Sequence, residues 1–151
     1  MNMNPHMLAG LVVGEGCFTV DGGADSKYSL GWRCRPQFSV AMVSEDRELL
    51  EALKEAMQSG YIYELDFGRY EKYAAKNWKP QSKFIVTRIE DLYSKVVPFF
   101  EKYPLAGRKK KAFKLFAQIV KIRYEEKRIT AVNINKLQEL TNELKSLNKR
   151  G

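Results

Sequence analysis

One stretch near the start of the chain, residues 7–19, restricts the fold more than any other. It reads M-L-A-G-L-V-V-G-E-G-C-F-T and carries no charge before Glu15. Gly10 and Gly14 are four residues apart and share one face of a helix, although glycine in a helix costs about 1 kcal/mol relative to alanine. Close packing of another backbone against that face would compensate for the cost. The alternative is a buried N-terminal helix whose Glu15 is only its solvated end, because G-x-x-x-G spacing is weak evidence outside membranes.

Residues 8–16, L-A-G-L-V-V-G-E-G, resemble the nine-residue motif that names the LAGLIDADG homing endonucleases. They match it at the first four positions, the apolar fifth, the acidic eighth and the final glycine. Val13 stands where the family often has Asp, and Glu15 stands at the penultimate position, which in the family binds metal. Two such helices pack together in the family, so a single motif implies a symmetric homodimer. The interface residues implied by this resemblance are Leu8, Ala9, Gly10, Val13 and Gly14.

The net charge of +8 and the pI near 9.5 favour a polyanionic partner, either nucleic acid or an anionic membrane surface. Scattered lysines on a basic protein are the alternative explanation. With 151 residues, 44% of them hydrophobic, and no repeat, we interpret residues 1–151 as one domain with a real core.

Cys17 and Cys34 predict neither a disulfide framework nor a zinc site, because no Cys-x-x-Cys or paired histidine accompanies them. The single histidine, His6, is expected at the surface. The apolar run 7–13 is too short to span a bilayer, and no basic segment of a signal peptide precedes it. We therefore expect no membrane partner, and a cytoplasmic protein or one in an organelle matrix.

Hydrophobic periodicity predicts a helix, two strands, a helix, two strands and a helix, followed by C-terminal helices. After the first helix come strands at 17–21 and 28–43 around a turn at 22–26, and then a helix from the cap Ser44 to Gly60. The second pair of strands is expected at 61–67 and 83–89, around a polar loop from Gly68. The remaining helices are expected at 90–103 (broken at Pro98), 112–126 and 130–147. This order is the α-β-β-α-β-β-α unit of the same family. The resemblance implies an α+β fold whose antiparallel, saddle-like sheet carries helices on one face.

The chemistry implied by the resemblance is phosphodiester hydrolysis, which needs an activated water, a Lewis acid and charge balance. Glu15 from each subunit would hold divalent ions, with backbone carbonyls of Gly14 and Gly16 as further oxygen ligands. Such ligands suit Mg²⁺.

A cation near the metal site would stabilise the developing charge or orient the water. In the family a lysine shortly after a P-L-x-G turn has this role, and residues 104–109 read P-L-A-G-R-K. Lys109 is our first candidate because the chemistry favours a lysine. Counting without gaps from the downstream helix favours Arg108, so both residues stay open. The alternative is that the run 108–111 only contacts phosphates, which is commoner. Ser44 is the polar residue nearest the position at which the family orients water.

Base recognition would fall to the open face of the sheet, where Arg reads guanine and Gln reads adenine. Any half-solvated sheet shows the same alternation, so a contact role is favoured most for the arginines, Gln37 and Lys83. Trp32 and Trp78 fit either the core or the surface, and Lys110, Lys149 and Arg150 suit phosphate contacts. The face residues are Cys17, Thr19, Asp21, Arg33, Arg35, Gln37, Ser39, Tyr61, Tyr63, Leu65, Lys79, Gln81, Lys83, Ile85 and Thr87.

The leading hypothesis is a dimeric, Mg²⁺-dependent endonuclease that cuts double-stranded DNA at a long pseudo-palindromic site, as intron-encoded homing enzymes do. An RNA-splicing maturase that binds intron RNA, or a DNA-binding regulator without cleavage, is the alternative on the same fold, and Val13 keeps it open. The positive charge alone also fits a structural RNA-binding protein.

Overall fold

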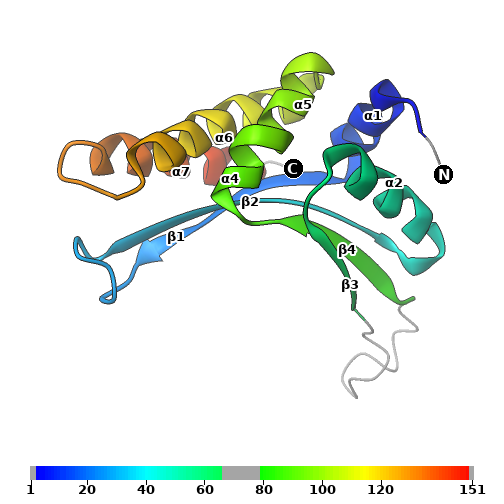
Figure 1. The fold of residues 1–151 in the computed structure, drawn as a ribbon. Helices are drawn as coiled ribbons and strands as arrows, with labels where there is room; N and C mark the ends of the chain where they lie inside the picture. Colours follow the sequence, from blue (N-terminus) through cyan, green and yellow to red (C-terminus); the bar gives the residue numbers. More distant parts are fainter. Residues whose placement is uncertain (1–2, 66–78, 150–151) are drawn as a thin grey trace.

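The computed structural model describes residues 3–65 and 79–149, which form two layers (Figure 1). One layer is an antiparallel sheet in the order β1-β2-β4-β3. Its strands are β1 (Gly16–Ala24), β2 (Trp32–Val43), β3 (Tyr61–Leu65) and β4 (Gln81–Val86). The sheet is arched, and its concave underside is open (Figure 1). The α+β class and the antiparallel sheet expected from the sequence are confirmed.

The other layer consists of helices that cover the upper face of the sheet (Figure 1). They are α1 (Pro5–Glu15), the 3₁₀ turn η1 (Ser44–Asp46), α2 (Arg47–Met57), α4 (Ile89–Asp91), the π-helical η3 (Leu92–Val96), α5 (Val97–Lys102), α6 (Gly107–Glu126) and α7 (Ile134–Lys149). No helix in the described ranges is long and apolar enough to cross a membrane.

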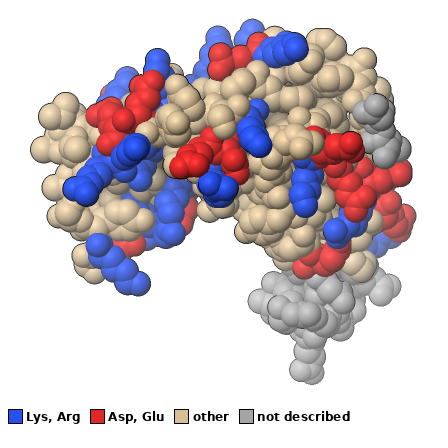
Figure 2. Space-filling model, viewed as in Figure 1, with Lys and Arg blue, Asp and Glu red and all other residues tan. Residues whose placement is uncertain are grey.

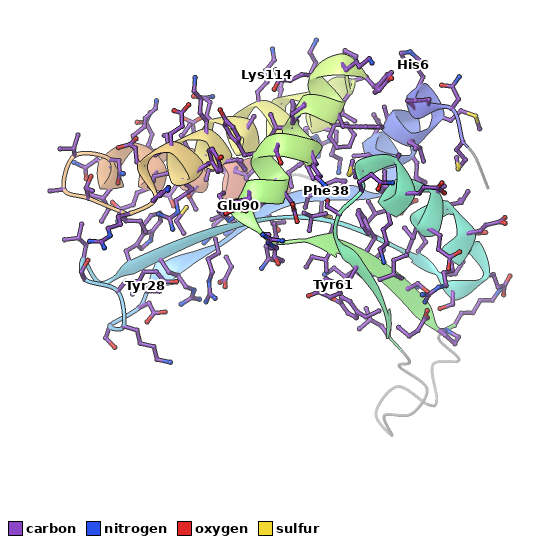
Figure 3. The ribbon with its side chains drawn as sticks, viewed as in Figure 1. His6, Tyr28, Phe38, Tyr61, Glu90 and Lys114 are labelled. Atoms are coloured by element: carbon purple, nitrogen blue, oxygen red, sulfur yellow. The ribbon has the colours of Figure 1, made fainter. Side chains whose placement is uncertain are left out.

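The core lies between the two layers, where aromatic side chains of the sheet meet those of the helices. Phe18 of β1 stacks on Phe38 of β2 with ring centroids 5.1 Å apart, and Phe100 and Phe116 pack against them from α5 and α6. Figure 3 shows Phe38 directed into this layer. The apolar parity predicted for β2 is confirmed, because Cys34, Phe38 and Val40 are all buried.

The first turn of the sheet differs from the prediction. Gly22 and Gly23 belong to β1, and the chain reverses at 25–31. There the Asp25 carboxylate accepts a hydrogen bond from the Lys27 backbone N–H at 3.0 Å, and Gly31 supplies a φ of +71°. An Asx turn and a glycine with positive φ are enough to reverse the chain direction, and no pair of adjacent glycines is needed. The hairpin is therefore longer than the one predicted with a turn at 22–26.

Several helix boundaries also differ. Helix α6 begins at Gly107 rather than at residue 112, so the basic run 108–111 forms its first turn. Helix α7 begins at Ile134 rather than at 130, because Thr130 and Asn133 exchange backbone-to-side-chain hydrogen bonds of 2.8 and 3.2 Å before it. The interruption expected at Pro98 occurs slightly earlier, as the π-helical turn η3 that ends at Val96, and Pro98 lies in the first turn of α5.

Other sequence predictions concern single positions. Trp32 is half-buried against the core, and His6 is exposed and packs edge-on against the Tyr103 ring. The strand end at 66–67, the loop from Gly68, Trp78 and Arg150 lie outside the described residues.

Candidate functional site

The motif helix α1 joins β1 directly, with Glu15 as its last residue and Gly16 as the first residue of the strand. A Cβ atom on Gly16 would lie 2.5 Å from Cγ1 of Val12 and 2.8 Å from the Val12 carbonyl oxygen. Real Cβ atoms do not approach neighbours so closely, so only glycine fits here. This tight junction fixes the exposed Glu15 at the boundary between helix and sheet.

The two faces of α1 have different environments. Leu8 and Ala9 are 1% and 4% exposed, because with Val12 they form the side of α1 that packs into the chain's own core. The prediction that Leu8 and Ala9 lie at a dimer interface is therefore wrong.

The opposite side of α1 is open. Met7 and Val13 are 61% and 36% exposed, and a Cβ atom built on Gly10 or Gly14 meets nothing within 4 Å. Gly10 and Gly14 therefore face outward, where the chain leaves open space beside the helix.

Lys109, in the first turn of α6, reaches the end of the motif. Its Nζ donates a hydrogen bond to the backbone carbonyl of Gly16. The carbonyl end of a helix carries a partial negative charge, and α1 has no basic residue in its last turn. The ammonium therefore supplies positive charge at the carbonyl end of α1, at the residue that follows Glu15. Arg108, the other candidate, is exposed in the same helical turn.

A cavity of about 550 Å³ opens beside this contact. It is enclosed by the end of α1, the start of β1, the first turn of α6 and the end of α7. Its lining residues are Val13, Cys17, Thr19, Ala106, Gly107, Arg108, Lys109, Ala112, Leu147 and Asn148.

Asn148 belongs to this region but was not identified from the sequence. Its Nδ2 donates to the Phe18 carbonyl at 3.0 Å, and Lys145 donates to the Gly22 carbonyl at 2.8 Å. Helix α7 thereby covers carbonyls along the outer edge of β1, the first strand of the sheet. No motif or spacing marks Asn148, since its role depends on where α7 crosses the strand.

Ser44 lies in a different cluster, in the 3₁₀ turn η1 that precedes α2. Its hydroxyl donates to the Glu64 carboxylate at 2.8 Å, and the Ser82 hydroxyl donates to the same carboxylate at 2.7 Å and lies 2.9 Å from the Ser44 oxygen. These two hydroxyls, together with the Arg47 guanidinium, hold the pKa of Glu64 below its usual range. Ser44 therefore makes no side-chain cap, and none of its contacts reaches Glu15 or Lys109. The expectation that Ser44 caps the helix is corrected here, whereas its role in orienting water stays a prediction.

Within the part of the chain that the structure describes, the motif supplies the oxygen donors predicted to bind metal. Residues 3–65 and 79–149 contain no group of three or more His, Cys, Asp or Glu side chains that could hold a metal ion. Glu15 offers a carboxylate, and Gly14 lies in the last turn of α1, where carbonyls lack intrahelical partners. These oxygen donors suit Mg²⁺ in type. A single carboxylate leaves most positions around such an ion to other oxygen ligands.

Strand register brings the predicted recognition residues onto one face. Asp21 pairs with Arg35, Thr19 with Gln37, and Tyr63 with Lys83. Figure 3 shows Tyr61 on the underside of the sheet, away from the helices. The residues that share this open face are Cys17, Thr19, Asp21, Arg33, Arg35, Gln37, Ser39, Tyr61, Tyr63, Leu65, Gln81, Lys83 and Ile85.

Two of these residues are poorly placed for contact. Ser39 and Ile85 are only 8% and 7% exposed; they pair directly with each other across β2 and β4, with Cys17 and Tyr61 on their other sides. The prediction that they contact DNA is corrected accordingly. Arg33 is also engaged, because its guanidinium binds the carboxylates of Asp21 and Asp25.

Charge is unevenly distributed over the molecule. Figure 2 shows Lys and Arg side chains around the outer end of the β1–β2 hairpin and acidic side chains over α2. It also shows the underside hollowed between the two halves of the sheet. Lys110 is exposed in the first turn of α6. A basic region beside a concave sheet favours a polyanion at that face.

Comparison with known proteins identifies relatives over most of the chain. The family model described as LAGLIDADG endonuclease matches residues 8–120. A probable intron-encoded endonuclease 2 of Neurospora crassa is 29% identical over 138 residues, and a probable intron-encoded endonuclease 3 of that organism is 28% identical over 137. Each alignment covers 91% of this chain. The chain spans only 28% and 24% of the length of these two relatives.

Solved structures share the fold. The homing endonuclease I-TnaI is 26% identical, with a TM-score of 0.77 and coverage of 99% of this chain and 96% of its own. I-SmaMI bound to an uncleaved DNA target in the presence of calcium ions is 26% identical with a TM-score of 0.82. That comparison covers 95% of this chain and 45% of I-SmaMI.

Proposed function

Because the chain belongs to the LAGLIDADG endonuclease family, we propose that it is a site-specific endonuclease that cuts double-stranded DNA at a long pseudo-palindromic site. The observation that carries the proposal is the contact of the Lys109 ammonium with the carbonyl of Gly16, directly after Glu15. Folding thereby brings the acid of the motif close to a cation from a distant helix. A carboxylate and a cation at adjacent positions of one site suit phosphodiester hydrolysis.

The active unit of the proposal is a homodimer that packs through α1. Support comes from the exposed side of that helix, on which Gly10 and Gly14 leave space. Met7 and Val13 would flank the contact. The two-fold axis would bring two Glu15 carboxylates together, which accounts for the single carboxylate that each chain contributes.

The metal of the proposal is Mg²⁺, held by Glu15 and the Gly14 carbonyl of both chains. When bound, the metal would act as a Lewis acid on the phosphate and lower the pKa of a water molecule. Lys109 would stabilise the negative charge that develops on the phosphate, with Arg108 as the alternative cation. The calcium ions named for I-SmaMI with its DNA support a divalent ion in this fold.

The DNA of the proposal lies in the concave underside of the sheet. Arg35, Gln37 and Lys83 would read base edges in the major groove, where each base pair presents a distinct pattern of donors and acceptors. Lys110 would contact phosphate. We propose the cytoplasm or an organelle matrix as the location of the protein.

A second function, an RNA-splicing maturase or a DNA-binding regulator without cleavage, is favoured by one observation. Val13 replaces the acid that the motif often has at that position and is exposed on α1. Binding would then be retained without hydrolysis, and intron RNA would be a partner in the maturase case.

Cleavage of randomised duplexes by the wild type and Glu15→Gln, in Mg²⁺ and in Ca²⁺, distinguishes these functions. The proposal predicts Mg²⁺-dependent cutting of a near-palindromic site, which Glu15→Gln abolishes while specific binding in Ca²⁺ persists. Glu48→Gln, an exposed change on α2, is the matched control and should cut normally. Specific binding without cutting under either ion would instead support the second function.

A further inference from the structure

Asp21 is the centre of an ionic cluster on the open face of the β1–β2 hairpin. Its Oδ1 accepts hydrogen bonds from Nε and Nη2 of Arg33 at 3.1 and 3.0 Å. Its Oδ2 lies 3.6 Å from Nη2 of Arg35. Asp25 completes the cluster by accepting from Nη1 of Arg33 at 3.3 Å. One carboxylate therefore contacts both arginines that the sequence assigned to base recognition.

The register of the hairpin produces this geometry. Asp21 pairs directly with Arg35, whereas Arg33 pairs with Gly23. Gly23 has no side chain, and a Cβ built there meets nothing within 4 Å. Arg33 therefore reaches diagonally across the strand pair to Asp21, a separation that long side chains span in antiparallel sheets.

The two arginines consequently differ in what they can offer to DNA. Arg33 uses three of its five N–H donors within the cluster, and its side chain is 28% exposed. Its hydrogen bond to Asp21 raises the pKa of the guanidinium above its usual value. The side chain of Arg35 is 59% exposed, and Nη2 alone makes its ion pair. Since bidentate reading of guanine requires two adjacent N–H donors, Arg35 is the better reader.

We propose that Asp21 is a positioning residue that sets base specificity by anchoring Arg33 and orienting Arg35 toward one guanine in each half-site. The proposal rests on the DNA-binding function proposed above. A carboxylate beside Arg35 restricts the directions in which its guanidinium can donate, and it repels a backbone phosphate that would otherwise compete for it. Asp21 therefore increases discrimination among bases rather than total affinity.

A first experiment examines the cluster without DNA. In ¹⁵N NMR spectra of the wild type, the Arg33 Nε–Hε group should exchange slowly with solvent because Asp21 binds it. Asp21→Ala should abolish this protection and Asp21→Asn should weaken it, because a neutral amide oxygen is a poorer acceptor, whereas Glu48→Gln, which removes one negative charge from α2, should do neither. Rapid exchange of the group in the wild type would overturn the proposal.

A second experiment measures specificity. Randomised duplexes are selected by binding in Ca²⁺ with the wild type, Asp21→Asn, Arg35→Ala, Arg33→Ala and Glu48→Gln, and each variant's melting temperature is recorded as a test of folding. Asp21→Asn and Arg35→Ala should lose about fivefold or more of the preference for guanine at the same position of each half-site. Total binding by Asp21→Asn should not fall, because the substitution removes a negative charge. Arg33→Ala should not lose the preference for a base at any other position of the half-site. Glu48→Gln should show the same preferences as the wild type.

The outcomes separate the two proposals. If the wild type selects a sequence and Asp21→Asn selects it equally well, only the positioning role fails. A separate guanine position lost in Arg33→Ala would also overturn that role, because Arg33 would then be a reader. If the wild type selects no sequence at all, the proposed function itself fails.

Discussion

The ammonium of Lys109 donates a hydrogen bond to the backbone carbonyl of Gly16, which lies 93 residues earlier in the chain. Gly16 follows Glu15 at the carbonyl end of α1. The first turn of α6 is thus held against the motif helix before any DNA or metal binds. A lysine held in place need not reorganise when charge develops on a phosphate, and preorganised charges are the most effective in catalysis.

Lys109 and Arg108 are expected to differ in effect although they are adjacent. Lys109→Met should lower kcat by about 10²- to 10³-fold, the loss typical of a group that stabilises transition-state charge. Arg108→Met should mainly weaken binding and reduce the slope of log affinity against log salt by about 0.9 if it contacts one phosphate. Single-turnover cleavage and salt titrations measure both effects. The reverse pattern would identify Arg108 as the active-site cation.

Gly10 and Gly16 are expected to respond in opposite ways to a larger side chain. Gly10→Leu places its side chain in open space, so the variant should still fold, but sedimentation velocity should show a monomer. Gly16→Ala should destabilise the fold by about 1–3 kcal/mol, because its Cβ collides with Val12. The control is Lys114→Leu, which introduces a leucine on the outer face of α6 instead of α1 (Figure 3) and should leave the dimer intact. A dimeric Gly10→Leu would exclude this face of α1 as the interface.

The Glu64 cluster predicts a pH-dependent contribution to stability. The hydroxyls of Ser44 and Ser82 lower the pKa of Glu64 in the folded state. A depressed folded pKa stabilises the fold above the unfolded pKa of about 4.3, and this contribution is lost as the pH falls through the folded value. The wild type should therefore melt above Glu64→Gln at pH 7, and the difference should shrink on acidification below pH ~4.3. A constant difference in melting temperature at all pH values would contradict the assignment.

The reactivity of Cys17 should show whether DNA covers the open face of the sheet, and the buried Cys34 should react slowly. Cys17 is exposed, whereas Cys34 is buried, and burial raises the pKa of its thiol. A thiol reagent should therefore modify one cysteine quickly in the folded protein, and bound target DNA should slow that reaction. Cys17→Ser should remove the fast phase and thus confirms which thiol reacts. An unchanged rate in the presence of bound DNA would place the DNA elsewhere.

Much of the fold follows from local patterns in the sequence. The alternation at residues 33–40 separates Arg35 and Gln37 from Phe38 and Val40, and the structure places them on opposite faces as predicted. The motif at 8–16 marks the junction of helix and strand and the position of Glu15. Periodicity carries this information because the direction of a side chain depends on the backbone conformation of its own segment.

The tertiary structure alone decided which distant groups meet. Packing of α6 selected Lys109 for the Gly16 carbonyl, the crossing of α7 brought Asn148 to β1, and strand register joined Asp21 to Arg33. It also turned Leu8 and Ala9 inward, although small residues on a helix fit either side of it equally well. The sequence by itself determined the elements, their faces and the chemical groups that the chain carries. Contacts between elements depend on register and packing across the whole chain, which no local pattern contains.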